Sequence, residues 1–147
     1  MRMISKILLT CAGVFLLSGC AQDSEPQPSA TLSPEVYGAL LANGDAEAGK
    51  RIYIYCQSCH SINEGGPNKV GPNLYGIYGR QAARNEDFIF SAVLTEANVT
   101  WTEDALDQWI LRPTALVPGT TMVFAGVSNL QQRADLIAFL REAGPER

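Results

Sequence analysis

The sequence predicts an all-α fold, and three observations support that prediction. Apolar residues recur at helical spacing, for example at Leu106, Trp109 and Ile110. Residues that commonly begin helices precede several such stretches, and no segment has the alternating pattern of a strand. The 147 residues, 46% hydrophobic and 18% charged, are enough for one modest soluble domain and a processing segment.

The N-terminus has the pattern of a secretory signal. Arg2 and Lys6 precede an apolar run, residues 7–17, that is too short to span a bilayer comfortably. The run ends in Leu17-Ser18-Gly19-Cys20, which resembles the bacterial lipobox, where the cysteine receives a diacylglyceryl group and becomes the first residue after cleavage. An ordinary cleaved signal and a short retained anchor are the alternatives.

We therefore expect residues 1–19 to be a lipoprotein signal peptide that is removed, and Cys20 to be lipidated. The mature protein would lie in the bacterial periplasm, anchored to a membrane. The residue after Cys20 is Ala21, not the aspartate that retains lipoproteins in the inner membrane of many Gram-negative bacteria. Sorting to the outer membrane is therefore a hypothesis.

Residues 20–43 are expected to form the lipidated N-terminus, a flexible linker and one short helix. Residues 21–33 are rich in polar residues and proline and lack periodic apolar positions, which is typical of a tether. Ser33, Pro34 and Glu35 then match an N-cap, a first-turn proline and a first-turn acid. The candidate contacts of this helix are apolar: Val36, Leu40 and Leu41.

Helix formers run from residue 46 to residue 55 and lead into Cys56-Gln57-Ser58-Cys59-His60. This C-x-x-C-H spacing is that of a c-type haem attachment site. On a helical turn each thiol can form a thioether with one vinyl group of the porphyrin, and the imidazole of His60 then lies beneath the iron. We expect one covalent haem c bound through Cys56 and Cys59, with His60 as an axial iron ligand.

Three other kinds of site share part of this pattern. A thioredoxin-like redox pair also has C-x-x-C, but no strand of a βαβ unit precedes Cys56. A zinc site needs four ligands, and His60 is the only histidine of the chain. A structural disulfide between Cys56 and Cys59 is sterically possible but leaves His60 without a role.

Met122 is the candidate for the second axial ligand. Once the signal segment is removed with Met1 and Met3, the chain retains one histidine and one methionine, and a six-coordinate iron needs two axial ligands. A lone methionine more often fills a core. Met122, however, stands in an extended loop, residues 114–127, so we expect it to bind the iron opposite His60.

Three further helices are expected after His60. A short one around residues 88–94 has Asn85 or Asn98 at one end, and the next begins at Thr102 and is stopped by Pro113. The last begins at a capping-box match over residues 128–131 and ends before residues 144–145, a Gly-Pro pair. Between His60 and the first of these helices, we expect a loop with glycines where the backbone passes close to another group. The apolar stripe of the last helix is Leu130, Leu136, Ile137 and Leu140.

Residues 44–143 resemble a class I cytochrome c of the mitochondrial and bacterial c2 type. The matching stretches are Gly44-Asp45 with Gly49-Lys50, the C-x-x-C-H, Gly71-Pro72-Asn73-Leu74-Tyr75-Gly76 with Gly79-Arg80, Trp101, Pro118-Gly119-Thr120-Thr121-Met122-Val123-Phe124-Ala125-Gly126, and Arg133-Ala134-Asp135-Leu136-Ile137-Ala138-Phe139-Leu140. The resemblance implies a domain over residues 44–147 with three to five helices around one covalently attached haem. It also implies electron transfer, not enzymatic turnover of a substrate.

The resemblance implies roles for four more residues near the haem. The carbonyl of Pro72 should accept a hydrogen bond from the ring of His60, unless Pro72 is only a turn proline. Trp101 should donate its indole N–H to a haem propionate, or is a core aromatic. Arg80 should offset propionate charge, or is a solvated surface group. Thr120 should place its hydroxyl near Met122, or is only a loop residue.

Two departures from the family pattern concern the haem environment. Phe90 and Trp109 stand where the family often has tyrosines that reach the inner propionate and the methionine sulfur. Phe90 cannot donate a hydrogen bond, which should alter the surroundings of the propionate. In addition, the lysine ring around the mitochondrial haem edge is missing.

A third departure concerns the helix before the haem attachment site. It is one residue shorter between Gly49 and the first cysteine than in mitochondrial proteins. One residue rotates a helix by about 100°. Either the helix adjusts, or Ala48 and Ile52 replace Gly49 and Tyr53 against the last helix.

The expected function is that of a periplasmic, membrane-tethered monohaem cytochrome that carries single electrons between respiratory or photosynthetic proteins. Its partners should be of the oxidase, reductase or reaction-centre type, and the protein should be a monomer. A formal charge of −4, more negative once Arg2 and Lys6 are removed, argues against nucleic acid as a partner. Two alternatives stay open: a fixed subunit of a larger dehydrogenase or reductase complex, and a haem sensor or peroxidase with a labile Met122.

Overall fold

The structure is a computed structural model that describes residues 32–145 of the chain. Over this range it has six α-helices, one 3₁₀ helix and no strand, which confirms the all-α prediction. The predicted signal peptide, Cys20 and most of the predicted linker lie outside the described residues. Between residues 32 and 145, no helix combines the length and the apolar character needed to cross a membrane.

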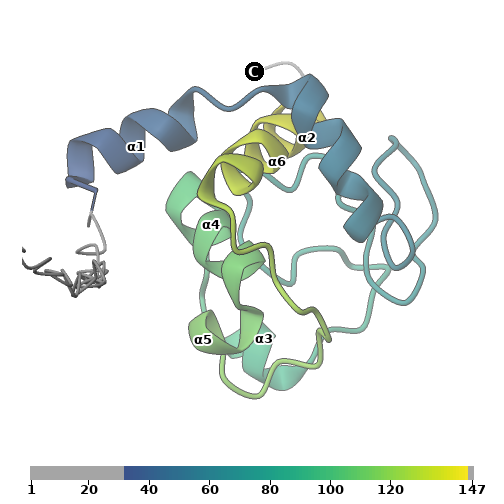
Figure 1. Cartoon of the computed structure of the whole chain (residues 1–147). Coiled ribbons are helices and arrows are strands. Elements are labelled where there is room, and N and C mark those ends of the chain that lie inside the picture. The colour runs from purple at the N-terminus through teal and green to yellow at the C-terminus, as the bar shows by residue number, and fades with distance from the viewer. Residues whose placement is uncertain (1–31, 146–147) are drawn as a thin grey trace, which may run out of the picture. The chain divides into compact units, whose positions relative to one another are not determined.

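Helices α2 (Ala46–Ile52) and α6 (Leu130–Glu142), from opposite ends of the domain, pack against each other (Figure 1). Gly49 permits this close packing, because a Cβ there would overlap the carbonyl of Asp135 and lie 2.9 Å from the Cβ of Phe139. On α6, Leu136 and Ile137 are fully buried, as the apolar stripe predicts. The α2–α6 contact is therefore set by a glycine on one helix and an apolar face on the other.

The one-residue deletion before Cys56 is absorbed by a change of helix type. The α-helix predicted to residue 55 ends at Ile52, and the 3₁₀ helix η1 (Tyr53–Tyr55) follows, with the Cys56 amide donating to the Tyr53 carbonyl at 2.8 Å. A 3₁₀ turn takes 3.0 residues where an α turn takes 3.6. Gly49 and Tyr53 thus both keep their places against α6, and the Tyr53 ring lies 5.4 Å from that of Phe139. The structure therefore has the adjusted helix, and Ala48 and Ile52 do not replace these residues.

Helix α1 (Pro34–Ala42) begins as the sequence predicts, with the Ser33 hydroxyl accepting a hydrogen bond from the Val36 amide at 3.4 Å. Leu41 is fully buried and Leu40 packs on the core, whereas Val36 is 51% exposed. We expected a boundary between residues 43 and 44. In the structure α1 packs on α6 and α4, and the compact unit to which it belongs begins at Leu32, while the boundary itself stays a prediction.

Helix α4 (Glu103–Leu111) has the predicted N-cap, Thr102, which accepts from the Ala105 amide at 3.2 Å, and its predicted apolar face is buried. Pro113 ends it as expected but also begins an unpredicted short helix, α5 (Pro113–Leu116), since its fixed φ suits a first helical position. The N-cap of α6 is Asn129, not the Ser128 of the capping-box match. The Asn129 side chain accepts from the Gln132 amide at 3.0 Å.

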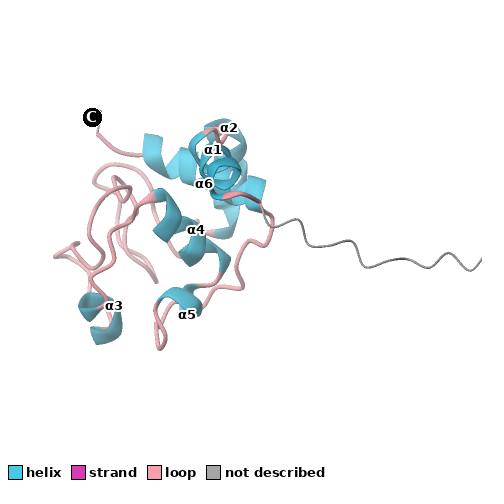
Figure 2. Cartoon of the chain, turned by 90° about the vertical axis from the view of Figure 1, so that its left-hand side faces the viewer, coloured by secondary structure: helices cyan, strands magenta, loops and turns pink. Residues whose placement is uncertain are grey.

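The short helix expected around residues 88–94 lies further along the chain, as α3 (Ala92–Glu96). Ser91 has an extended conformation and precedes the helix, while Asn98, with φ of 51°, takes the left-handed conformation just after it. Phe88 and Phe90 are therefore in a loop, where their rings pack edge to face at 4.9 Å. Figure 2 shows that most of the loop structure gathers on the side away from α1, α2 and α6.

Candidate cofactor site

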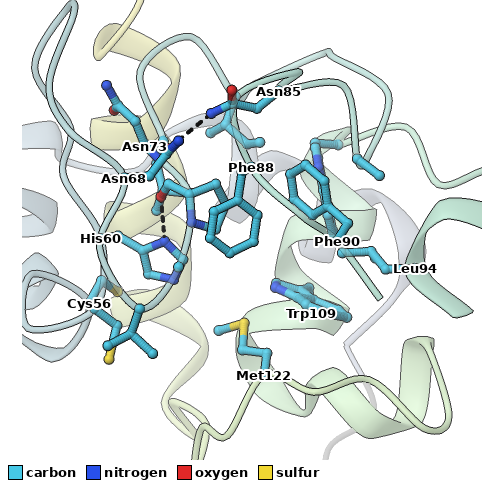
Figure 3. Close-up of a pocket in the computed structure, with 18 of the residues that line it drawn as sticks. Cys56, His60, Asn68, Asn73, Asn85, Phe88, Phe90, Leu94, Trp109 and Met122 are labelled. Atoms are coloured by element: carbon cyan, nitrogen blue, oxygen red, sulfur yellow. Dashed lines mark hydrogen bonds between the residues drawn. The ribbon is translucent and has the colours of Figure 1, made fainter. Parts of the chain in front are cut away.

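A cavity of about 820 Å³ lies between these loops and helices α4 and α6. Its volume is within the range of small-molecule and cofactor sites, about 300–1,000 Å³. The residues predicted to hold a haem all line it: Cys56, Cys59, His60 and Met122. Figure 3 shows His60 and Met122 projecting into the cavity from different segments of the chain.

The ring of His60 is held by its neighbours. Its Nδ1 lies 2.7 Å from the carbonyl oxygen of Pro72, as the resemblance implied. Because a carbonyl only accepts, Nδ1 carries the proton and Nε2 keeps its lone pair for a metal. Gly71 leaves room for the ring, since a Cβ there would lie 2.7 Å from Nδ1. Burial lowers the pKa of His60, which also favours the neutral imidazole that a metal requires.

Cys56 and Cys59 lie on the turn that leads to His60. The amides of Cys59 and His60 both donate to the Cys56 carbonyl, at 3.0 and 2.9 Å. The two thiols are free and half-buried, and no disulfide joins them. Burial raises the pKa of the Cys56 thiol to about 11, whereas the cysteine of a redox-active pair needs a lowered pKa. These observations disfavour the disulfide and the thioredoxin-like pair.

Met122 is held by its own loop. The Thr120 hydroxyl accepts a hydrogen bond from the Met122 amide at 3.3 Å, and the Thr120 amide donates to the Val117 carbonyl at 3.1 Å. At the other end of the loop, the Val127 amide donates to the Ile110 carbonyl at 3.0 Å. Thr120 thus lies near Met122 as expected, but its hydroxyl contacts the backbone of that residue.

Trp101 and Arg80 reach the cavity together because their segments pair. The Trp101 amide donates to the Arg80 carbonyl, and the Gly79 amide donates to the Trp101 carbonyl, each at 2.8 Å. Trp101 is 5% exposed and Arg80 is exposed, and both line the cavity. Within residues 32–145, neither the indole N–H nor the guanidinium has a hydrogen-bond acceptor. Two unused donors at one edge of the cavity suit the carboxylates of a haem.

Asn68 holds two loops of the cavity wall together, and sequence reasoning missed it. Its side-chain oxygen accepts from the Asn73 amide at 2.9 Å and from the Asn85 side chain at 3.1 Å, while its side-chain nitrogen donates to the Asp87 carbonyl at 2.9 Å. Figure 3 shows Asn68 and Asn85 joined above the cavity. No local pattern marks Asn68, because its partners are up to 19 residues away.

Phe90 and Trp109, which differ from the family pattern, both line the cavity. The Trp109 ring lies 5.2 Å from that of Trp101, so two indoles cover the same wall. Phe90 adds an apolar surface and no hydrogen bond at its position, as the sequence predicts.

The model of the cytochrome c family matches residues 46–144. The chain belongs to the cytochrome c family. A cytochrome c2 of Blastochloris viridis is 42% identical over 104 residues, which are 71% of this chain and 82% of the relative. A cytochrome c of Guizotia abyssinica is 40% identical over 99 residues, or 67% of this chain and 89% of the relative. The solved structure of cytochrome cH from Methylobacterium extorquens is 38% identical, with a TM-score of 0.64, and the match covers 67% of this chain and 99% of that one.

Membership confirms the class I cytochrome c fold and a covalently bound haem c, for which the two cysteines have the required spacing. This cytochrome is a monohaem electron carrier and not an enzyme. Helix α1 lies outside the matched residues. Its contacts with α4 and α6 therefore join a segment outside the matched residues to helices inside them.

Proposed function

We propose that this cytochrome works in the bacterial periplasm, anchored to a membrane by lipid at Cys20, and passes electrons between respiratory or photosynthetic redox proteins. The apolar run of residues 7–17 and the lipobox-like tetrapeptide that follows support the proposal. The tether, residues 21–33, reaches at most about 43 Å, so the domain stays close to the membrane. Ala21 favours the outer membrane.

The main support for the proposed electron-transfer site is that four side chains line one cavity. Cys56 and Cys59 would form the thioethers, and His60 and Met122 would bind the iron from opposite sides. When bound, the haem iron takes up and releases one electron, alternating between Fe(III) and Fe(II). Trp101 and Arg80 would donate to the propionates.

The protein's contribution is to hold these side chains still. The Pro72 carbonyl fixes the orientation of His60, and the Thr120 hydroxyl fixes the backbone of Met122. A bound iron would then keep the same two side chains in both oxidation states, so little rearrangement would accompany transfer. Apolar side chains in the lining, among them Leu74 and Leu94, exclude water. They disfavour additional positive charge in the cavity, which favours the reduced state and raises the potential.

Partner docking is proposed to be mainly apolar. Val70, Ile89 and Val123 line the cavity and are 81%, 96% and 99% exposed, so they form an apolar rim. Among the described residues that line the cavity there is no lysine. Electron transfer to a partner oxidase should therefore depend little on ionic strength. A steep fall in turnover with added salt would contradict apolar docking.

The test of the site is an absorption spectrum with a redox titration of correctly matured protein. The pigment should stay with the protein in acidified organic solvent, and the ferric form should have the near-infrared absorption of a sulfur-ligated haem. Met122→Ala should lose that absorption and lower the potential, because a thioether ligand favours Fe(II). Retention of the absorption in Met122→Ala would exclude Met122 as the ligand.

The test of the anchor is a comparison of wild type with Cys20→Ser. Wild type should sediment with membranes and carry a lipid by mass spectrometry of its N-terminal peptide, whereas Cys20→Ser should not. The haem spectrum of the two should be the same. Wild type found only in the inner-membrane fraction would exclude outer-membrane sorting, and a soluble wild type without lipid would exclude the anchor.

A further inference from the structure

Helix α1 is joined to the core of the domain by hydrogen bonds and not only by apolar packing. The Tyr37 hydroxyl on α1 donates to Oδ2 of Asp107 on α4 at 2.6 Å. Oδ1 of the same carboxylate pairs with Nε of Arg133 on α6 at 2.6 Å. Asp107 and Arg133 are 3% and 5% exposed, so water competes little for either charge.

Arg133 in turn holds the end of the loop that carries Met122. Its Nη1 donates to the carbonyls of Val127 and Ser128, at 3.0 and 2.8 Å. These carbonyls lie where the Met122 loop joins α6. The chain of contacts therefore runs from α1 through one carboxylate and one guanidinium to the backbone beyond Met122.

Tyr37 is the main partner of Oδ2 in this arrangement. The other contact of that oxygen, with Nη2 of Arg133, is long at 3.5 Å. Without the Tyr37 hydroxyl, the buried carboxylate would need a second donor, and the nearest is the guanidinium of Arg133. A shift of Arg133 toward Oδ2 would strain its two bonds to the loop carbonyls.

We propose that α1 braces the Met122 loop, and that Tyr37 is a positioning residue which makes displacement of Met122 from the haem iron less favourable. The inference rests on the proposed ligation of the iron by Met122. Displacement of Met122 by an added ligand would exchange one iron–sulfur bond for one bond to that ligand, without a change of oxidation state. If the brace is weakened, the ferric protein should therefore bind added ligands more tightly.

The experiment measures imidazole binding to the ferric full-length holoprotein by its absorption spectrum. Hydrogen bonds to charged groups are strong enough that Tyr37→Phe should bind imidazole about tenfold more tightly than wild type. Asp45→Ala is the control, because it removes the α2 N-cap, which accepts from the amides of Glu47 and Ala48, without contact to the brace. Chemical unfolding of both variants gives their loss of global stability.

The proposal requires that Tyr37→Phe, but not Asp45→Ala, bind imidazole more tightly than wild type. Unchanged binding in Tyr37→Phe overturns the brace. An equal increase in both variants, in proportion to their lost stability, also overturns it, because the effect is then general. If the wild-type ferric spectrum lacked the near-infrared sulfur absorption, Met122 would not be the iron ligand. This result would contradict the proposed ligation itself, and so differs from a result that contradicts only the brace.

Discussion

Replacing Gly71 by alanine tests how the protein seats His60. The added Cβ would overlap Cε1 of the imidazole and lie 2.7 Å from Nδ1 and 2.8 Å from Nε2. Ordinary contact begins at 3.4 Å, so the ring would have to move by more than about 0.7 Å. This movement would lengthen the 2.7 Å hydrogen bond to the Pro72 carbonyl. Overpacking of about 1–3 kcal/mol and a lost hydrogen bond of about 0.5–1.5 kcal/mol together predict a loss of about 1.5–4.5 kcal/mol in the free energy of unfolding.

The assay is chemical unfolding of the holoprotein together with a redox titration. Losing the Pro72 acceptor makes the imidazole a poorer electron donor, so the potential should rise, by at most about 60 mV. Gly38→Ala is the matched control, because an added Cβ on α1 meets nothing within 4 Å and should stabilise by about 0.5–1 kcal/mol. If Gly71→Ala kept both the wild-type potential and a stability within about 0.5 kcal/mol, this account of His60 would be refuted.

Three further predictions concern the loops, the helix packing and pH. Asn68→Ala removes three hydrogen bonds between cavity loops and should cost about 2–4 kcal/mol in chemical unfolding. Gly49→Ala should separate α2 from α6 and cost more than about 2 kcal/mol, with Gly38→Ala again as control. Burial, and then the hydrogen bond to Asp107, raise the pKa of Tyr37 above 10.0. The stabilisation contributed by the neutral Tyr37 hydroxyl is fully present below about pH 10 and is lost as pH rises through the folded-state pKa. The stability difference between wild type and Tyr37→Phe should therefore shrink above about pH 10.

The sequence was most informative where a local rule decides the structure. Ser33 and Thr102 accept hydrogen bonds from the amides of their own helices, as capping residues should. Pro113 ends α4 because the residue before a proline avoids the helical conformation, and Arg112 is extended with φ of −161°. The two cysteines and His60 were found from residue type and spacing, and Met122 was found because it is the one methionine left after the signal segment.

Local rules failed where two of them competed. Ser128 and Asn129 are both good N-caps, and the capping-box match favoured Ser128, whereas the structure uses Asn129. Pro113 is both a helix stop and a favourable first helical residue, and only the first role was expected. The choice in such cases depends on where the backbone must go next, which the neighbouring elements decide.

Asp107 illustrates why the buried charges were beyond sequence reasoning. On α4 the apolar face predicted from periodicity consists of Leu106, Trp109 and Ile110, and a charged residue beside that face ordinarily meets solvent. Asp107 is nevertheless 3% exposed, because α1 packs on α4 and brings Tyr37 to its carboxylate. A buried carboxylate requires a partner, and Arg133 lies 26 residues away on α6. The burial of Asp107 is thus a consequence of the N-terminal helix, and it is the same contact that ties this helix to the loop of the proposed iron ligand.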